Sequence, residues 1–248
     1  MITMPHTPST LQDFPYAAGI QAIQESLAFT DFDAFYQHLL HGLPQNSPVT
    51  RRRYASLVVR WFFPERRLGG LLPRAWAAYH DESLLLELVR VTTLETEPVI
   101  AGFVTNVILA SPPGQAFDLA AARDYVVATY GTYKENSYKR LLLTARQLGF
   151  LARHGNEWLV PWIPTPANGL LILLHARLAP TPRIVRISEL LAAPFWRYLG
   201  YRSAEDVRST LRTAQAAGLI ARYSVVDELE QVTTCHSCDD YLRHAMRP

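Results

Sequence analysis

The chain is short of cysteine and of lysine. Its 248 residues include only two cysteines, Cys235 and Cys238. This number excludes a disulfide framework and suits a protein of the reducing cytosol. Lys134 and Lys139 are the only lysines, so arginine supplies the rest of the basic side chains. With lysine at these two positions, the sequence offers no acid-x-lysine motif of the kind that forms a nuclease core.

Long apolar runs and common catalytic motifs are also missing. The longest apolar stretches, residues 98–110 and 170–174, fall short of the roughly 20 residues that span a bilayer. Residues 1–10 lack the basic-then-apolar pattern of a secretory signal. The sequence has no glycine-rich phosphate loop with lysine, no Gly-x-Ser-x-Gly elbow and no His-Glu-x-x-His helix. We therefore expect a cytoplasmic protein that is not an enzyme, holds no cofactor and has no membrane segment.

The chain has little net charge, but its charge is unevenly distributed. The formal net charge is +2, so a nucleic-acid surface would have to come from local segregation of basic side chains. Residues 81–97 and 227–240 are acidic, whereas residues 51–74 contain a single acid, Glu65. We expect DNA phosphates to be held by arginines of this basic stretch, and the alternative is a solvated helix face and turn. These arginines are Arg51, Arg52, Arg53, Arg60, Arg66 and Arg67.

The most distinctive feature is a segment that occurs twice, at residues 139–153 and 208–222. Each copy reads as a helix that is stopped by a glycine, Gly149 or Gly218, and is followed at once by a short apolar strand. This order is typical of the recognition helix and wing of a winged helix-turn-helix. Nucleic-acid binding is therefore the leading function to test.

Local signals around the first copy predict a compact module. Asp118 is expected to cap a helix that runs to Thr129, and Asn136 to cap the first repeated helix. Strands at residues 150–153 and 157–162 would form a two-stranded wing. An apolar stripe at helical spacing marks the buried side of the repeated helix, and it consists of Tyr138, Leu141, Leu142, Ala145 and Leu148.

The second copy is predicted in the same way, and Ser203 is expected to cap its repeated helix. The preceding helix, residues 188–198, would be interrupted or bent by Pro194. The full series is a helix, a strand, two helices and two strands, which is the winged-helix order. Its expected ranges are residues 170–178, 183–187, 188–198, 204–217, 219–225 and 229–233.

The fold class predicted for the whole chain is mainly α: an N-terminal helical bundle followed by winged helix-turn-helix-like modules with short β wings. Breaks rich in proline or glycine divide the sequence into residues 1–116, 117–166 and 167–248. Ser47 and Pro48 are expected to open the arginine-rich helix, which Pro64 would end. The N-terminal helices are predicted at residues 31–41, 48–63, 73–80, 82–93 and 97–109.

The outward faces of the two repeated helices carry long polar side chains. Alignment places Lys139, Leu143 and Arg146 opposite Arg208, Arg212 and Gln215, and such side chains suit base edges and phosphates. Arg153 and Arg222 occupy equivalent places in the two wings. The second wing carries the acids Asp227, Glu228 and Glu230, which make DNA binding by the second copy less expected. We therefore expect the first copy to matter more for DNA binding. The predicted DNA contacts in the two copies are Lys134, Lys139, Arg140, Arg146, Arg153, Arg208 and Arg212.

Cys235 and Cys238 have the spacing of half a zinc site, and His244 follows them. A closed zinc site needs four ligands, and the sequence has no second cysteine pair. We therefore favour two unligated thiols in a C-terminal helix or tail, and we predict no metal.

Two short stretches resemble a known family. They are Asn46-Ser47-Pro48-Val49-Thr50-Arg51, which opens the arginine-rich helix, and residues 133–151, in which a capped helix with Lys139 leads to Gly149-Phe150-Leu151. Over residues 30–180 the chain is similar to the BrxA family of the BREX bacteriophage-resistance systems. The resemblance implies a small, non-enzymatic DNA-binding protein that acts beside a methyltransferase, an ATPase and a phosphatase-like partner. The second copy and the cysteine pair extend beyond the matched part.

Two other functions stay open at this stage. A repeated basic helix that ends in a glycine and apolar residues can be a surface helix packed on a small sheet, and winged helices also serve as protein-docking modules. The near-neutral charge and the acidic segments therefore also fit an adaptor or scaffold of a multi-protein complex. A transcriptional regulator of its own locus is the third possibility.

Overall fold

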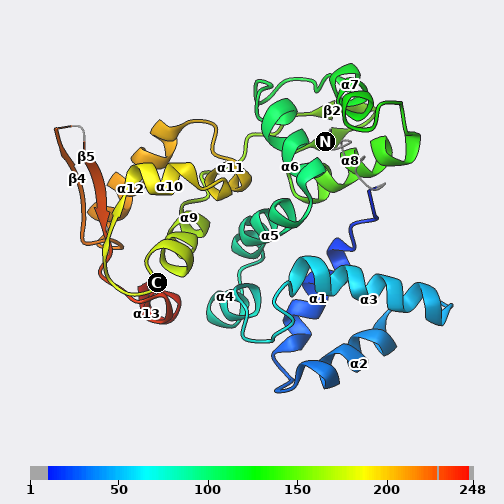
Figure 1. The fold of residues 1–248 in the computed structure, drawn as a ribbon, viewed down its shortest axis with the longest axis horizontal. Helices are drawn as coiled ribbons and strands as arrows, with labels where there is room; N and C mark the ends of the chain where they lie inside the picture. The colour runs from blue at the N-terminus through cyan, green and yellow to red at the C-terminus, as the bar shows by residue number, and fades with distance from the viewer. Residues whose placement is uncertain (1–10, 228, 246–248) are drawn as a thin grey trace, which may run out of the picture. The chain divides into compact units, whose positions relative to one another are not determined.

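The structure is a computed structural model that describes residues 11–227 and 229–245. Helices make up 60% of the chain and strands 9%, in two small antiparallel sheets, which confirms a mainly α fold (Figure 1). Packing divides the chain into two compact units. Unit 1 consists of Met1–Tyr16 and Leu94–Pro164, and unit 2 of Ala17–Thr93 and Thr165–Pro248. The predicted division into three domains, residues 1–116, 117–166 and 167–248, stays a prediction.

Unit 2 begins with short helices whose ends follow local sequence signals. Asp31 caps α2 by accepting a 2.8 Å hydrogen bond from the amide of Ala34. Pro48 occupies the first turn of α3, where its missing N–H costs nothing. Ser47 precedes it, but its side chain makes no capping hydrogen bond. The helices of this part are α1 (Tyr16–Ser26), α2 (Phe32–Gly42), α3 (Pro48–Phe62), α4 (Leu71–Tyr79) and α5 (Glu82–Thr96), the last of which runs on past the boundary of unit 2.

Aromatic side chains form the core of this helical part. Phe35 and Phe63 are buried with ring centroids 4.9 Å apart, and Phe62, which directly precedes Phe63, is buried as well. A Cβ atom on Gly19 of α1 would lie 2.1 Å from the Phe62 ring. Only glycine therefore allows α1 to lie against this ring of α3.

Unit 1 contains the first copy of the repeat. Its hairpin pairs Arg153 of the first strand with Trp158 of the second. Residues 114–117 lie along the other edge of the second strand, where Gly114 donates to the carbonyl of Val160 and Ala116 bridges Leu159. The sequence did not predict this third, strand-like segment. The named elements are α6 (Pro98–Phe103), its π-helical continuation η1 (Val104–Ile108), α7 (Leu119–Tyr130), α8 (Glu135–Gln147), β1 (Ala152–His154) and β2 (Glu157–Leu159).

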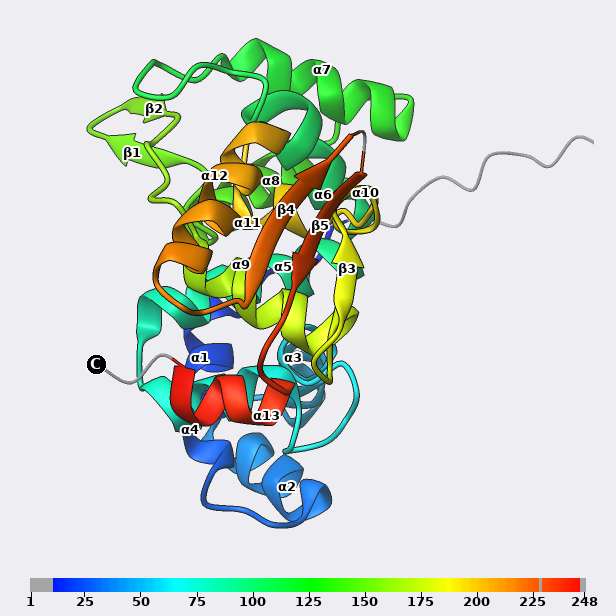
Figure 2. The ribbon, with the colours of Figure 1, turned by 90° about the vertical axis from the view of Figure 1, so that its left-hand side faces the viewer.

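The second copy follows in unit 2. Its antiparallel sheet places β5 between β3 and β4, as Figure 2 shows. Pro194 interrupts the helix predicted at residues 188–198, so that two short helices form instead of one. The elements are α9 (Ala167–Leu173), η2 (Leu174–Leu178), β3 (Ile184–Arg186), α10 (Ile187–Ala192), α11 (Phe195–Leu199), α12 (Ala204–Ala216), β4 (Arg222–Val226) and β5 (Leu229–Thr233).

The two copies share their order of elements and the way the repeated helix ends. Gly149 and Gly218 adopt left-handed φ angles of 73° and 72°. The following amides, of Phe150 and Leu219, each donate a 2.9 Å hydrogen bond back into the helix. In both copies a helix with a π-helical end and a strand-like segment come before the part that was recognised in the sequence. The structural repeat is therefore longer than residues 139–153 and 208–222.

The two repeated helices begin differently. Ser203 caps α12 through a capping box with Asp206, which confirms its predicted role. The predicted cap at Asn136 is wrong: α8 begins at Glu135, and Lys134 precedes it without a side-chain cap. Glu135 in the first turn supplies the negative charge that favours a helix start there.

A C-terminal helical segment closes unit 2. It comprises α13 (Cys238–Asp240) and η3 (Tyr241–Ala245). Tyr241 is fully buried and stacks on His175 of η2 with ring centroids 4.2 Å apart. The Tyr79 hydroxyl of α4 donates a 3.0 Å hydrogen bond to the Tyr241 carbonyl, and Arg74 of α4 forms an ion pair with Asp239. These contacts join the two separate stretches of unit 2.

Candidate nucleic-acid interface

Helix α8 has one buried side and one exposed polar side. The predicted apolar stripe is buried throughout, so it holds the helix on unit 1. Lys139, Leu143 and Arg146 are exposed. Because residues four and three positions apart lie on one side of a helix, these three form a row along α8. We call them the α8 row.

The two cations of the α8 row are open to an external anion. Lys139 pairs with Glu135 one turn earlier at 3.0 Å, but both side chains are more than half exposed, and such pairs contribute little energy. The Tyr133 hydroxyl also donates to Glu135, and together with Lys139 it lowers the pKa of this carboxyl. Arg146 makes no side-chain hydrogen bond or ion pair within the described residues. A phosphate or a base edge therefore faces little competition at either position.

Arg140 has a different environment, although it follows Lys139 directly. Its Nε atom lies 2.7 Å from the carboxylate of Asp13, and its Nη1 atom donates to the carbonyl of Leu11 at 2.6 Å. The side chain is only 26% exposed. The structure thus uses Arg140 to hold residues 11–13 against α8, and we leave it out of the interface.

Cationic side chains also lie before and after α8. Lys134 places its ammonium group 4.5 Å from the centre of the Tyr130 ring. Arg153 on β1 is exposed, donates to the carbonyl of Gly155 at 3.1 Å and lies 5.9 Å from the centre of the Trp158 ring. These side chains and the α8 row all belong to unit 1.

The corresponding face of α12 is occupied by contacts within the protein. Arg208 lies 2.9 Å from the carboxylate of Glu230 on β5, and Arg212 lies 2.7 Å from that of Glu205. These carboxylates raise the pKa of both guanidinium groups. Gln215 accepts a hydrogen bond from the backbone amide of Tyr223 on β4. The two repeated helices therefore match in fold and differ in the availability of their outward faces.

The arginine-rich part of unit 2 is partly engaged as well. Arg51 donates two hydrogen bonds to the carbonyl of Gln45, at 3.1 and 2.9 Å. Arg67 forms an ion pair with Glu65. The guanidinium of Arg66 lies 5.4 Å from the centre of the Phe32 ring. These contacts reduce the attraction that Arg51, Arg66 and Arg67 can offer a phosphate.

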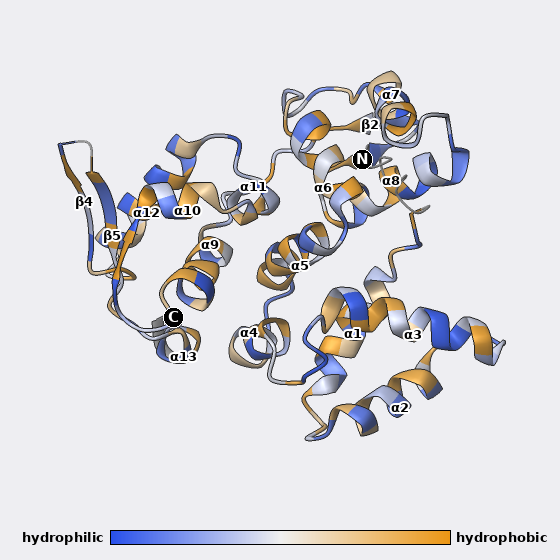
Figure 3. Cartoon of the chain, viewed as in Figure 1, coloured by the Kyte–Doolittle hydropathy of each residue, from blue (hydrophilic) through white to orange (hydrophobic). Residues whose placement is uncertain are grey.

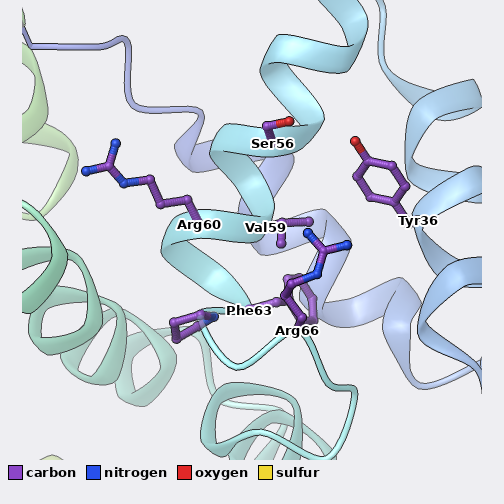
Figure 4. A pocket seen from close by; sticks show the side chains of 7 residues that line it. Tyr36, Ser56, Val59, Arg60, Phe63 and Arg66 are labelled. Atoms are coloured by element: carbon purple, nitrogen blue, oxygen red, sulfur yellow. The ribbon is translucent and has the colours of Figure 1, made fainter.

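Arg52, Arg53 and Arg60 are exposed on α3. The hydrophilic stretch that they help to form is visible in Figure 3. A hollow of about 220 Å³ lies beside α3 and is lined by Tyr36, Ser56, Val59, Arg60, Phe63, Pro64 and Arg66. In Figure 4, Arg66 extends on the same side of α3 as Tyr36, and Arg60 extends away from Tyr36. The two guanidinium groups thus do not converge on one anion.

One of the two C-terminal cysteines, Cys238, lies beside α4. Cys235 is exposed and Cys238 is half-buried, and burial raises the pKa of the Cys238 thiol. The Sγ atom of Cys238 lies 4.0 Å from Nη2 of Arg74. The side chain of His244 is outside the described residues. Among the described residues, no three histidine, cysteine or acidic side chains lie close enough together to hold a metal ion.

The sequence pointed to Glu230 as an acid of the second wing, but it did not single out Glu205 or the exposed aromatic side chain of Trp162. Glu205 precedes Arg212 by seven residues and so shares its side of the helix. Trp162 follows β2 and is 76% exposed, in contrast to the half-buried Trp158. Its place among prolines at residues 161–164 is the signal that points to an exposed loop.

The comparisons with known proteins add no relative: no family model, no curated protein and no solved structure matches the chain. In the described part of the chain, no helix combines the length and the apolar character needed to cross a membrane. The fold and the site define a mainly helical protein with a duplicated helix-and-hairpin unit, of which the first copy presents open cations.

Proposed function

We propose that this protein binds double-stranded DNA through α8 and the β1–β2 hairpin, and that it carries out no chemistry on the DNA. The order of elements in unit 1 supports a winged helix-turn-helix, in which α8 would be the recognition helix and the hairpin the wing. The observation that carries the proposal is the α8 row, whose Lys139 and Arg146 are open to an anion. The equivalent face of α12 is not open to an anion, because Arg208 and Arg212 already contact carboxylates.

In this proposal α8 lies in the major groove, which is wide enough to admit one helix. Arg146 and Lys139 contact base edges or phosphates there. Arg153 on the wing and Lys134 before α8 contact the phosphates on either side. Arg140 holds the N-terminal segment and does not touch DNA.

The exposed arginines of α3 supply a second, less specific contribution. Arg52, Arg53 and Arg60 would attract phosphates without reading bases, and salt would weaken that attraction steeply. Reversing the charge of Arg52 and Arg53 should therefore flatten the dependence of affinity on salt without changing sequence preference.

The cellular role that we propose is a DNA-binding component of a bacterial phage-defence system of the BREX type. This part of the proposal rests on the resemblance to the BrxA family over residues 30–180. It implies a cytoplasmic protein that works beside other defence proteins. A gene neighbourhood with a methyltransferase and an ATPase, and loss of phage resistance on deletion of the gene, would support it. A neighbourhood without defence genes would contradict it.

Titration of labelled duplex DNA by fluorescence anisotropy tests DNA binding directly. The logarithm of the binding constant should fall linearly with the logarithm of salt concentration. The variant Lys139→Glu with Arg146→Glu should lose most of its affinity at low salt. The matched control, Arg208→Glu with Arg212→Glu, should lose little. Absence of duplex binding by the unmodified protein at low salt would overturn the proposal.

A second candidate function is protein docking by the second copy. The neutral face of α12 favours it, and so do exposed apolar side chains at the tip of the β4–β5 hairpin, where Val226 is 61% and Leu229 43% exposed. Val226→Asp should then weaken capture of a partner protein and leave DNA affinity unchanged. An unchanged set of co-purified proteins would contradict this function.

A further inference from the structure

Leu143 is a large apolar side chain in the middle of the otherwise cationic α8 row. It is 46% exposed, whereas the apolar stripe on the other side of α8 is buried. Leu143 therefore adds little to the core of unit 1. Lys139 lies four residues before it and Arg146 three residues after it, so the three side chains project from the same side.

The equivalent position in the second copy shows what this place accepts. Arg212 occupies it, and its guanidinium reaches Glu205 on the same helix. A long cationic side chain thus fits the position and forms an ion pair within the protein. In the first copy the position holds leucine, which cannot form an ion pair and leaves apolar surface facing outward.

Geometry places Leu143 between two potential base contacts. A helix rises about 1.5 Å per residue, so Leu143 lies roughly 6 Å along the axis from Lys139 and roughly 4.5 Å from Arg146. Base pairs follow one another at about 3.4 Å. Leu143 would therefore face a base within one or two steps of those that its neighbours contact. Among the base-edge groups of the major groove, the apolar one is the C5-methyl of thymine.

We propose that Leu143 is a specificity residue that contacts the C5-methyl group of a thymine when α8 lies in the major groove. The inference rests on the proposed function, because it requires α8 to enter duplex DNA. Lys139 and Arg146 then supply affinity and fix the register, and Leu143 favours one base. An apolar patch on a protein partner is the competing use of this side chain.

Replacement of thymine by uracil tests the contact, because it removes only the methyl group and keeps base pairing. Preferred sites would first be selected from randomised duplexes at fixed salt. Each thymine of the best site would then be replaced by uracil in turn. The unmodified protein should lose about four-fold in affinity at one position, which is the effect of roughly one buried methyl group, 0.8 kcal/mol. At that position Leu143→Ala should bind thymine and uracil equally well.

Val127→Ala is the matched control, because Val127 is a comparably exposed apolar residue on α7 of the same unit. This variant should discriminate as the unmodified protein does, and circular dichroism would check that both variants keep their fold. Salt-dependent duplex binding that is insensitive to uracil at every position would overturn the inference and leave the proposed function standing. Full discrimination by Leu143→Ala would also overturn it, as would loss of a protein partner by this variant with discrimination intact. Failure to bind any duplex would overturn the proposed function itself.

Discussion

The guanidinium of Arg208 and the carboxylate of Glu230 form a close pair, with the Nε atom 2.9 and 3.0 Å from the two oxygens. Both side chains are about a quarter exposed. The pair links α12 to β5, and it uses the side chain that aligns with Lys139 of α8. A sequence repeat with similar basic residues thus contains one open face and one closed face.

Removal of the two acids should open the second face. In the variant Glu205→Gln with Glu230→Gln, Arg208 and Arg212 lose their carboxylate partners and become available to phosphates. We expect at least a three-fold gain in affinity for duplex DNA at low salt, together with a steeper salt dependence, because each new phosphate contact adds roughly 0.9 to the slope. Anisotropy titrations over a salt series would measure both. An affinity equal to that of the unmodified protein would show that α12 does not reach DNA.

Single substitutions should show which of the two repeated helices contributes to DNA affinity. Arg146→Ala should lower duplex affinity by at least five-fold and reduce the salt slope by about one, because Arg146 has no competing partner in the described residues. Arg212→Ala should lower affinity by less than two-fold, because two acids, Glu205 and Glu230, balance the two arginines of the α12 face. Equal losses in the two variants would refute the assignment of the interface to the first copy.

Arg140→Ala should affect stability and leave DNA affinity unchanged. The substitution removes the ion pair with Asp13 and the hydrogen bond to Leu11, and we expect a loss of about 1–2 kcal/mol in the free energy of unfolding. Urea denaturation would measure the loss, and titration at a temperature well below unfolding would measure DNA binding. Asp13→Asn should give a smaller loss in the same direction. A weakened DNA affinity with unchanged stability would return Arg140 to the interface.

Glu87 should make the stability of unit 2 depend on pH. Its carboxylate accepts a 2.8 Å hydrogen bond from the amide of Gly169. Burial, with a smaller contribution from Asp81, raises the pKa of Glu87 to about 7, although the Gly169 amide and Arg90 act in the opposite direction. An unfolded glutamate titrates near pH 4.3. Between these values the folded protein keeps a proton that the unfolded chain has released, so stability falls as pH rises, by up to roughly 3 kcal/mol, and levels off above about pH 7.

Glu87→Gln removes this dependence, because the amide oxygen can still accept from Gly169 and carries no charge. The variant should be more stable than the unmodified protein at pH 8 and similar to it at pH 5. Urea denaturation at four pH values between 5 and 8 would show this, with the exposed Glu82→Gln on the same helix as the control. A steep pH dependence that persists in Glu87→Gln would assign the effect to another group.

Features that depend on neighbouring residues were predictable from the sequence. Asp118 and Ser203 at helix starts, and Gly149 and Gly218 at helix ends, act through hydrogen bonds within a few residues, and the structure confirms them. The cap assigned to Asn136 failed because Glu135, one position earlier, already suits a helix start.

Features that join distant residues were not predictable. The strand-like segment 114–117 pairs with β2 through backbone groups and has no alternating apolar pattern to mark it. The partners of Arg140 and Arg208 lie 127 and 22 residues away in the sequence. These long-range pairs decide which of the predicted DNA contacts stay open to a phosphate, and composition alone does not show them.

The split arrangement of the two units has a consequence for synthesis. The longer stretch of unit 1, Leu94–Pro164, carries the α8 row and completes unit 1 before the second stretch of unit 2 is made. A ribosome therefore completes unit 1 before it makes Tyr241, whose contacts with Tyr79 and His175 hold the stretches of unit 2 together. The DNA-reading part that we propose can fold while the chain is still attached to the ribosome, but unit 2 has to wait for its final helix.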